Sequence, residues 1–198
     1  MSKYSYFNLI KSKAKTLAQE QGFKLSVAQE QLATSLKFKD FHELTTVASR
    51  NPDDARLIGA ALGSSNTADV IYDSPVYERF CEEIDNLLSG ETADTNAYDY
   101  SCEDFEVTAS SYDETKGLLA LEVSFTYSGE QDQDRPYAGC EFYLDVEVTL
   151  ARRSGEWLFE EDWVVLTKIE TDQDRDREAE LEDMYADYLK DKKRTDGM

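Results

Sequence analysis

The sequence predicts an α+β fold, in which an N-terminal four-helix module is followed by a helix, a four-stranded antiparallel sheet and a C-terminal helix. Two patterns predict this fold. Apolar residues recur every three or four positions over residues 1–63 and again over 74–88, as they do in helices that bury one face. Between residues 105 and 171 they instead alternate with polar residues, as in strands with one buried face.

The first two predicted helices have recognisable ends. One covers about residues 5–21, and Gly22 ends it because glycine readily adopts the left-handed conformation that follows a helix. The second helix covers about 27–36. Ser26, just before this helix, and Gln29, in its first turn, have the spacing of a capping box. In a capping box, the serine side chain bonds to a backbone amide of the first turn, and the glutamine side chain bonds back to the backbone amide of the serine.

Two further helices complete the module. Asp40 is the expected N-cap of the third helix, because its side chain can accept a hydrogen bond from the first turn. Asn51 is the expected cap of the fourth helix, and Pro52 suits its first position. Gly63 ends this helix. Tight connections between four short, capped helices predict a compact folding unit.

A second domain is expected over residues 70–198. The small, polar segment 64–69 is the best candidate for a linker to it. Ser74 is the expected N-cap of the next helix, and Gly90 is expected to end that helix.

Four strands are expected in two hairpins. The first strand begins at Phe105, and a turn at residues 113–117 leads into the second. The stretch Gly139–Thr171 predicts a long antiparallel hairpin, in which Arg153–Glu156 forms the turn. This hairpin is the centre of the predicted sheet.

One face of the sheet is apolar, and two helices are available to cover it. The last helix has an apolar stripe of Leu181, Met184, Tyr185 and Tyr188. If the strands pair in sequence order, the other face is polar and acidic. Its residues are Glu122, Ser124, Thr126, Tyr143, Asp145, Glu147 and Thr149.

Charge is unevenly divided along the 198 residues, whose net charge is −21. Residues 1–50 contain 8 Lys/Arg against 4 Asp/Glu, which gives +4, and the remainder contains 13 against 38, which gives −25. This asymmetry predicts two parts with different electrostatic partners. The acid has two explanations: it keeps the protein in solution, or it binds a basic protein surface.

The composition supports neither a membrane protein nor a disulfide-bonded one. No run of 18 apolar residues occurs, and the start of the chain lacks the apolar segment of a signal peptide, so a cytoplasmic location is expected. Cys81, Cys102 and Cys140 are odd in number and widely spaced. They are expected to be reduced thiols and to form neither a disulfide framework nor a zinc site.

No catalytic motif is present, and we predict no catalytic residue, no cofactor and no metal site. His42 is the only histidine, and it falls in a predicted helix start. Nucleotide-binding glycine motifs and the Gly-x-Ser-x-Gly motif are absent. The series Asp172, Asp174 and Asp176 imitates the first half of a calcium loop, but Arg177 stands where that loop needs glycine.

Part of the N-terminal module resembles a known sequence type. The matching residues are Ala14-Lys15-Thr16-Leu17, Gly22, Leu25-Ser26, Gln29, Leu32-Ala33 and Phe38 to Leu44. They are similar to a small helical module of bacterial and mobile-element proteins that is labelled as related to the glyoxalase superfamily. The resemblance implies a four-helix unit and a bacterial, plasmid or phage setting. It implies no catalytic residue, because glyoxalases need His and Glu metal ligands in paired βαβββ units.

The leading functional hypothesis is a non-enzymatic acidic module that binds a basic protein surface. Its strongest form is a mobile-element inhibitor that imitates the charge of nucleic acid and binds a nucleic-acid-binding protein. The residues predicted to contact the partner are Asp132, Asp134, Asp145, Glu147, Glu160, Glu161, Asp162, Asp172, Asp174 and Asp176.

Two alternatives belong to other classes. The first is a nucleic-acid-binding regulator that uses the N-terminal module, with Lys37 and Lys39 near phosphates. Asp40 and Glu43 at the start of the would-be recognition helix oppose DNA, so direct nucleic-acid binding is not expected. The second alternative is an enzyme with a cup-shaped sheet of the cystatin-like or nuclear-transport-factor-like kind, which would need an enclosed polar pocket.

Overall fold

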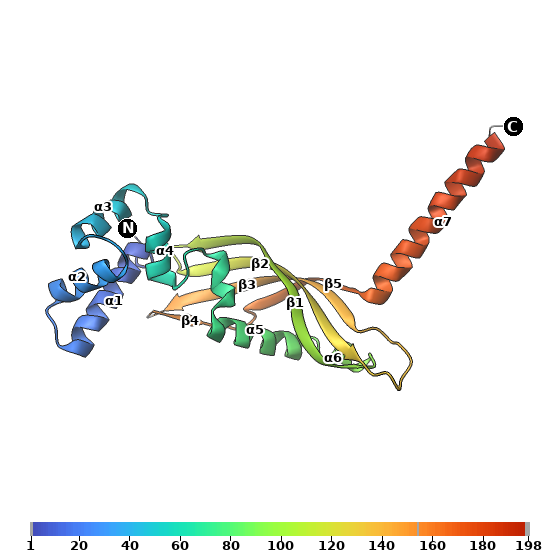
Figure 1. The fold of residues 1–198 in the computed structure, drawn as a ribbon, viewed down its shortest axis with the longest axis horizontal. Coiled ribbons are helices and arrows are strands. Elements are labelled where there is room, and N and C mark those ends of the chain that lie inside the picture. Colours follow the sequence, from blue (N-terminus) through green and yellow to red (C-terminus); the bar gives the residue numbers. More distant parts are fainter. Residues whose placement is uncertain (1, 154, 197–198) are drawn as a thin grey trace. The chain divides into compact units, whose positions relative to one another are not determined.

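The structure, a computed structural model, describes residues 2–153 and 155–196, with all of their side chains except those of residues 187 and 190–196. It confirms the α+β fold class, with helices before and after a five-stranded antiparallel sheet (Figure 1). The helices are α1 (Tyr6–Gln21), α2 (Leu25–Ser35), α3 (Phe41–Arg50), α4 (Ala55–Leu62), the 3₁₀ helix η1 (Ala68–Tyr72), α5 (Ser74–Leu87), α6 (Ser89–Ala93) and α7 (Asp172–Asp196). The strands are β1 (Ala97–Asp113), β2 (Leu118–Gln131), β3 (Glu141–Arg153), β4 (Glu156–Leu158) and β5 (Val164–Thr171).

The N-terminal helices are arranged around α1, which packs against α2, α3 and α4. The N-cap of α1 is Ser5, whose side chain accepts a hydrogen bond from the backbone N–H of Asn8. Gly22 ends α1 at φ +67°, as predicted. Asp40 caps α3 by accepting a hydrogen bond of 2.7 Å from the N–H of Glu43. The predicted four-helix order is therefore confirmed.

Two predicted helix starts in the N-terminal module are wrong. Ser26 lies inside α2, and the N-cap is Lys24, which makes no side-chain cap bond. The first turn of α2 is held instead by the Lys24 carbonyl, which accepts hydrogen bonds from backbone amides. Asn51 does not cap α4. Asp54 caps it, by accepting a hydrogen bond of 3.0 Å from the N–H of Arg56.

The sheet has the strand order β1-β2-β3-β4, and β5 also pairs with β3. Its core face consists of the alternating residues of β2 and β3 that the sequence predicts, all of them buried: Leu119, Leu121, Val123, Phe125, Tyr127, Phe142, Leu144, Val146, Val148 and Leu150. On the other face, Ser124 Oγ donates a hydrogen bond of 2.6 Å to Asp145 Oδ1. The predicted pairing of the polar faces of β2 and β3 is therefore correct.

The predicted Gly139–Thr171 hairpin is correct in its first strand and wrong in its second. The return is divided into β4 and β5 by the segment between Phe159 and Trp163. Asp162 has a left-handed backbone with φ +56°, which bends the chain there. Trp163 is buried, and its ring meets that of Phe159 edge-on with centroids 4.7 Å apart. Phe159 and Trp163 therefore produce a strand-like pattern in the sequence although they lie in a loop.

The segment before the sheet also differs from the prediction. Ser74 is not the N-cap of α5, because it lies inside the helix and its hydroxyl donates a hydrogen bond of 2.6 Å to Glu78. Gly90 does not end a helix, because it lies within the short α6. β1 begins at Ala97, well before the predicted start at Phe105. Asp99 and Asp104 have positive φ angles of 50° and 49°. Such residues interrupt the regular alternation of a strand, and this explains why the sequence pattern missed the first part of β1.

Of the two helices expected to cover the sheet, α5 buries its apolar face and α7 does not. Phe80 of α5 meets Trp163 edge-on at 6.5 Å, and Asp85 of α5 accepts a hydrogen bond of 2.6 Å from Tyr127. The predicted stripe of α7 is exposed, with fractions from 56% to 66% at Leu181, Met184, Tyr185 and Tyr188. None of the helices in the described residues has the length and apolar character needed to cross a bilayer.

Contacts within the chain define two compact units. Unit 1 comprises residues 1–80, 107–123 and 147–165, and unit 2 comprises residues 81–106, 124–146 and 166–198. Each of β1, β2 and β3 therefore contributes a segment to both units. The division into domains 1–63 and 70–198 is a different one, based on the linker pattern, and it stays a prediction.

Candidate functional site

An open groove of about 930 Å³ lies in unit 1, beside α1, α2 and the turn between β3 and β4. The cations that line it are Lys3, Lys11, Lys13, Lys15 and Arg153, and the carboxylates that line it are Glu20 and Glu156. The lining also includes four leucines, namely Leu9, Leu17, Leu25 and Leu32. In a chain of net charge −21, a groove with more cations than carboxylates is a local reversal of the overall charge.

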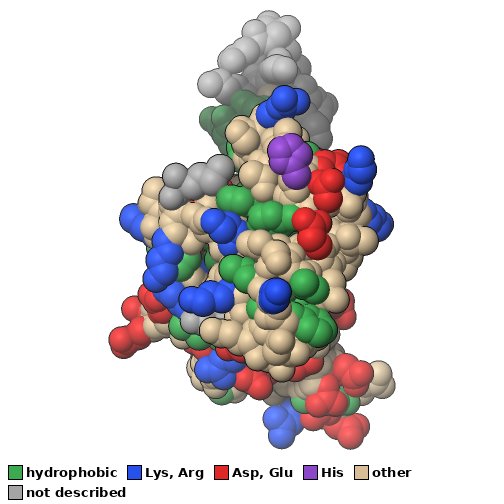
Figure 2. All heavy atoms as spheres, turned by 90° about the vertical axis from the view of Figure 1, so that its left-hand side faces the viewer, with side chains coloured by type: hydrophobic (Ala, Val, Ile, Leu, Met, Phe, Trp, Pro, Cys, Tyr) green, Lys and Arg blue, Asp and Glu red, His purple; other side chains and the backbone are tan. Residues whose placement is uncertain are grey.

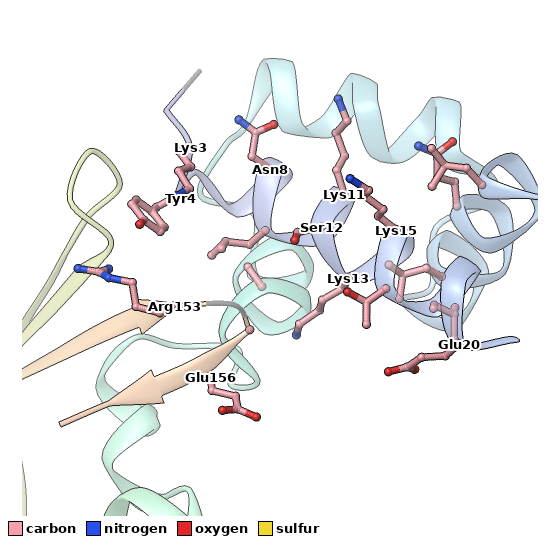
Figure 3. A pocket seen from close by; sticks show the side chains of 18 residues that line it. Lys3, Tyr4, Asn8, Lys11, Ser12, Lys13, Lys15, Glu20, Arg153 and Glu156 are labelled. Atoms are coloured by element: carbon pink, nitrogen blue, oxygen red, sulfur yellow. The ribbon is translucent and has the colours of Figure 1, made fainter. Parts of the chain in front are cut away.

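The spacing of residues along α1 determines how the groove is built. Asn8 and Ser12 lie one helical turn apart on the face that borders it. Figure 3 shows Lys11 and Lys15, also one turn apart, extending from one side of α1, whereas Lys13 extends from the opposite side. The groove therefore has amide and hydroxyl groups along α1 with ammonium groups on both sides.

Lys13 is held by the fold. Its Nζ donates a hydrogen bond of 2.6 Å to the carbonyl of Ala60, and the buried Arg152 donates one of 3.1 Å to the carbonyl of Ala61. Both cations thus meet the last turn of α4, where free carbonyls and the helix dipole favour positive charge. Burial, with a smaller contribution from Arg152, lowers the pKa of Lys13. These two cations join α1 and β3 to α4.

Arg153 lies at the end of β3. Its guanidinium donates hydrogen bonds of 3.0 and 3.2 Å to the carbonyls of Lys116 and Gly117, and it lies 5.0 Å from the ring centre of Tyr4. The carbonyls and the ring are uncharged. Arg153 is therefore fixed in position mainly by neutral groups, and its acidic neighbour is the exposed Glu160, 3.9 Å away.

Lys3, Lys11 and Lys15 are the exposed lysines of the groove. The Nζ atom of Lys3 lies 5.1 Å from the ring centre of Tyr4, and that of Lys11 lies 5.3 Å from the ring centre of Phe7. On the face drawn in Figure 2, Lys and Arg side chains gather on the left-hand half, beside hydrophobic ones. The groove thus suits an anionic ligand that also has an apolar part.

Sequence reasoning did not identify these lysines. It named Lys37 and Lys39, which are exposed in the turn between α2 and α3 and are not among the residues that line the groove. A signal was available, because Lys11 and Lys15 lie four residues apart in a predicted helix and outside its apolar stripe.

Most of the acid belongs to unit 2, which has 25 Asp/Glu against 8 Lys/Arg, giving −17. Its segment 81–106 contains nine carboxylates and neither Lys nor Arg. All of these except Glu83 are exposed, namely Glu82, Asp85, Glu91, Asp94, Asp99, Glu103, Asp104 and Glu106. Sequence reasoning counted this charge but did not name these residues.

The ten carboxylates predicted to contact a partner fall into two groups. Unit 1 contains Glu147, Glu160, Glu161 and Asp162, and unit 2 contains Asp132, Asp134, Asp145, Asp172, Asp174 and Asp176. Their role in binding stays a prediction, and several of them also have local structural partners.

Asp172 and Asp174 anchor the first turn of α7. Asp172 accepts a hydrogen bond of 2.9 Å from the backbone N–H of Cys140 and another from the hydroxyl of Tyr137. Burial raises the pKa of Asp172, but these hydrogen bonds outweigh it, so the pKa lies below the ordinary value. Asp174 accepts a hydrogen bond of 2.8 Å from the hydroxyl of Thr171. Both carboxylates thus stabilise the start of the helix.

The other predicted carboxylates are less constrained. Asp132 forms an ion pair of 3.3 Å with Arg135, and Asp134 is exposed. Asp145 is half-buried through its bond to Ser124, whereas Glu147 is exposed two residues further along β3. The exposed acids Glu160, Glu161 and Asp162 occupy the break between β4 and β5, and Glu160 lies 3.9 Å from Arg153.

The histidine and the cysteines are not among the residues that line the groove. His42 is exposed on α3, and Cys81, Cys102 and Cys140 are free thiols. Burial, followed by the nearby Cys81, raises the pKa of the Cys102 thiol and so makes it a poor nucleophile. Among the side chains that the structure describes, no three His, Cys, Asp or Glu form a group able to hold a metal ion.

Comparison with known proteins gives no match among protein-family models, curated proteins or solved structures. The resemblance of residues 14–44 to the glyoxalase-related helical module therefore stays a prediction.

Proposed function

We propose that the protein is a non-enzymatic interaction protein, whose acidic unit 2 binds a basic surface of another protein. The main support is segment 81–106, in which nine carboxylates occur without a Lys or Arg. Eight of them are exposed: seven on α5, α6 and β1, and Asp94 directly after α6. A surface with charge of one sign attracts an oppositely charged partner and accelerates association.

A nucleic-acid-binding protein is the class of partner that suits this surface. Such proteins have basic surfaces that bind the closely spaced negative charges of a nucleic acid. A module that imitates this charge would compete with the nucleic acid for the same surface, which is how an inhibitor encoded by a mobile element would act. Asp132, Asp134 and Asp145 of unit 2 would extend the acidic surface beyond segment 81–106.

The acid of β1 has a competing explanation, because β1 is an edge strand of the sheet. Charged side chains on an edge strand prevent it from pairing with strands of other molecules. Edge protection needs no partner, so a measurement of binding separates the two explanations.

The test compares two variants that lose the same number of charges. One removes four exposed carboxylates of segment 81–106 by the substitutions E91Q, D94N, E103Q and E106Q. The control removes four exposed carboxylates of unit 1 that are not among the predicted contacts, by the substitutions E20Q, D53N, D69N and E122Q. A basic nucleic-acid-binding protein is captured from bacterial lysate at low salt and purified, and its affinity for each variant is measured over a range of salt concentrations.

We expect the unit 2 variant to bind at least about tenfold more weakly and to show a flatter salt dependence, and the control to change affinity by less than about twofold. Duplex DNA should compete with the wild-type protein for the partner. Binding that is insensitive to salt, or that both variants weaken equally, would contradict the proposal.

A further inference from the structure

The exposed stripe of α7 has no described role in the fold. Leu181, Met184, Tyr185 and Tyr188 are spaced by three, four and seven residues, which places them on one face of the helix. Their exposed fractions are 56%, 66%, 64% and 60%. Single exposed apolar residues are common, but a contiguous patch of this kind is typical of an interaction surface.

Negative charge borders this stripe. Residues 172–183 contain seven carboxylates and two arginines. Arg175 lies 3.5 Å from Glu170, and Arg177 lies 3.8 Å from Asp174, so both arginines have acidic neighbours within unit 2. Asp176, Glu178, Glu180, Glu182 and Asp183 are exposed as well. Two such helices side by side in parallel would bring like charges together, which disfavours that pairing.

The groove beside α1 has the complementary properties. Lys11 and Lys15 are exposed on one side of α1, and Leu25 is 46% exposed on α2. Leu17 and Leu32 also line the groove. The groove therefore has the ammonium groups of Lys11 and Lys15, which Figure 3 shows, together with leucine side chains. This is the combination that an acidic amphipathic helix needs.

We propose that α7 of one molecule docks in the α1 groove of a second copy of this chain. The carboxylates of α7 face Lys11 and Lys15, and its apolar stripe covers the leucines of the groove. The occupant is a second copy because the stripe is exposed in the single chain, and every copy has a groove whose exposed lysines and leucines match the acidic border and the apolar side chains of the stripe. The contact joins two different surfaces. If each of two molecules places its α7 in the groove of the other, they form a closed dimer; if each α7 instead docks on a further molecule, the contact extends into a filament. This surface is distinct from segment 81–106, so the proposal does not depend on the proposed function.

Charge reversal on each side of the contact tests the proposal. The groove variant is K11E/K15E, and the helix variant is E178K/E182K. The control is K37E/K39E, which reverses two exposed lysines of the same helical module that do not line the groove. Sedimentation velocity of the full chain over a wide range of concentrations, at low and at high salt, measures association. Circular dichroism confirms that each variant is folded.

We expect the wild type and the control to associate as concentration rises, and each reversed variant alone to associate at least about tenfold more weakly. Mixing the two reversed variants should restore association, because the basic α7 of one then meets the acidic groove of the other, and the two unaltered surfaces still match. The variant M184S/Y188S should weaken association at both salt concentrations, because it removes apolar contact.

Three results would overturn the proposal. A wild type that stays monomeric at every concentration has no such contact. A groove variant that associates as strongly as the wild type shows that α7 pairs elsewhere, for instance with another α7. A monomeric wild type that binds single-stranded DNA, and loses this binding in K11E/K15E, shows that nucleic acid occupies the groove.

Discussion

Replacing Gly117 by alanine tests how firmly the first residues of the chain are held against the turn between β1 and β2. Gly117 has φ +68°, and a Cβ atom added there would lie 2.6 Å from Cγ of the Tyr4 ring. Gly22 is a matched control, because it has φ +67° and a Cβ atom there would meet nothing within 4 Å. The two substitutions share the cost of a left-handed alanine, and Gly117→Ala alone adds a collision with an aromatic ring.

The two costs can be separated. A left-handed conformation costs a non-glycine residue about 1–2 kcal/mol, which is the expected loss of unfolding free energy for Gly22→Ala. Overpacking against the Tyr4 ring adds about 1–3 kcal/mol, so the expected loss for Gly117→Ala is about 2–5 kcal/mol. In a chain of this length, the difference between the variants corresponds to a gap in Tm of roughly 2–12 °C.

Thermal unfolding followed by circular dichroism measures this gap. Combining Gly117→Ala with Tyr4→Ala should recover the part of the loss that comes from the ring, because the collision is then absent. Equal Tm values for Gly117→Ala and Gly22→Ala would refute the reasoning. Equal values would show that the Tyr4 ring does not lie over the turn. Lys3, whose ammonium group contacts that ring, would then not be held at the groove.

Two further substitutions test other parts of the structure. Asp40→Ala removes the N-cap of α3 and should lower the free energy of unfolding, measured in urea, by about 1 kcal/mol. Ser26→Ala, inside α2, should lower it much less. Equal losses would indicate that Ser26 does cap α2. The lowered pKa of Asp172 means that its stabilising contribution is present above the ordinary value of 3.8 and is lost as pH falls through its folded value. The difference in unfolding free energy between the wild type and Asp172→Asn should therefore shrink below pH 3.8, and a constant difference would contradict this assignment.

Helix ends were predictable where a single residue has the required property. Gly22 and Gly63 both have positive φ at the ends of α1 and α4, as glycine allows. The start of α4 was not predictable in the same way. Asn51 and Asp54 are both good caps, and spacing alone does not show which side chain meets an amide of the first turn. The helices could thus be predicted, but not every first residue.

Strand alternation predicted the core faces of β2 and β3 but not the ends of β1 and β5. Alternation assumes a regular strand, and the positive φ angles at Asp99, Asp104 and Asp162 each mark a departure from regular geometry. Trp163 is buried although it lies outside β5, so its apolar character indicates burial and not strand conformation. The sequence alone does not show whether an apolar residue belongs to a strand or is buried in a loop.

The groove could not be predicted, because it combines α1 and α2 with Arg153, Gly155 and Glu156, which are far away in the sequence. The positive charge of residues 1–50 was visible, yet its lysines have different roles. Lys13 is half-buried against the end of α4, whereas Lys11 and Lys15 are exposed at the groove, and Lys37 and Lys39 are exposed away from it. A net charge does not distinguish a cation that holds the fold from one that is available to a ligand. The variants K11E/K15E and K37E/K39E change the net charge by the same amount. A difference in association between them therefore reports where the lysines lie in the fold and not how much charge was changed.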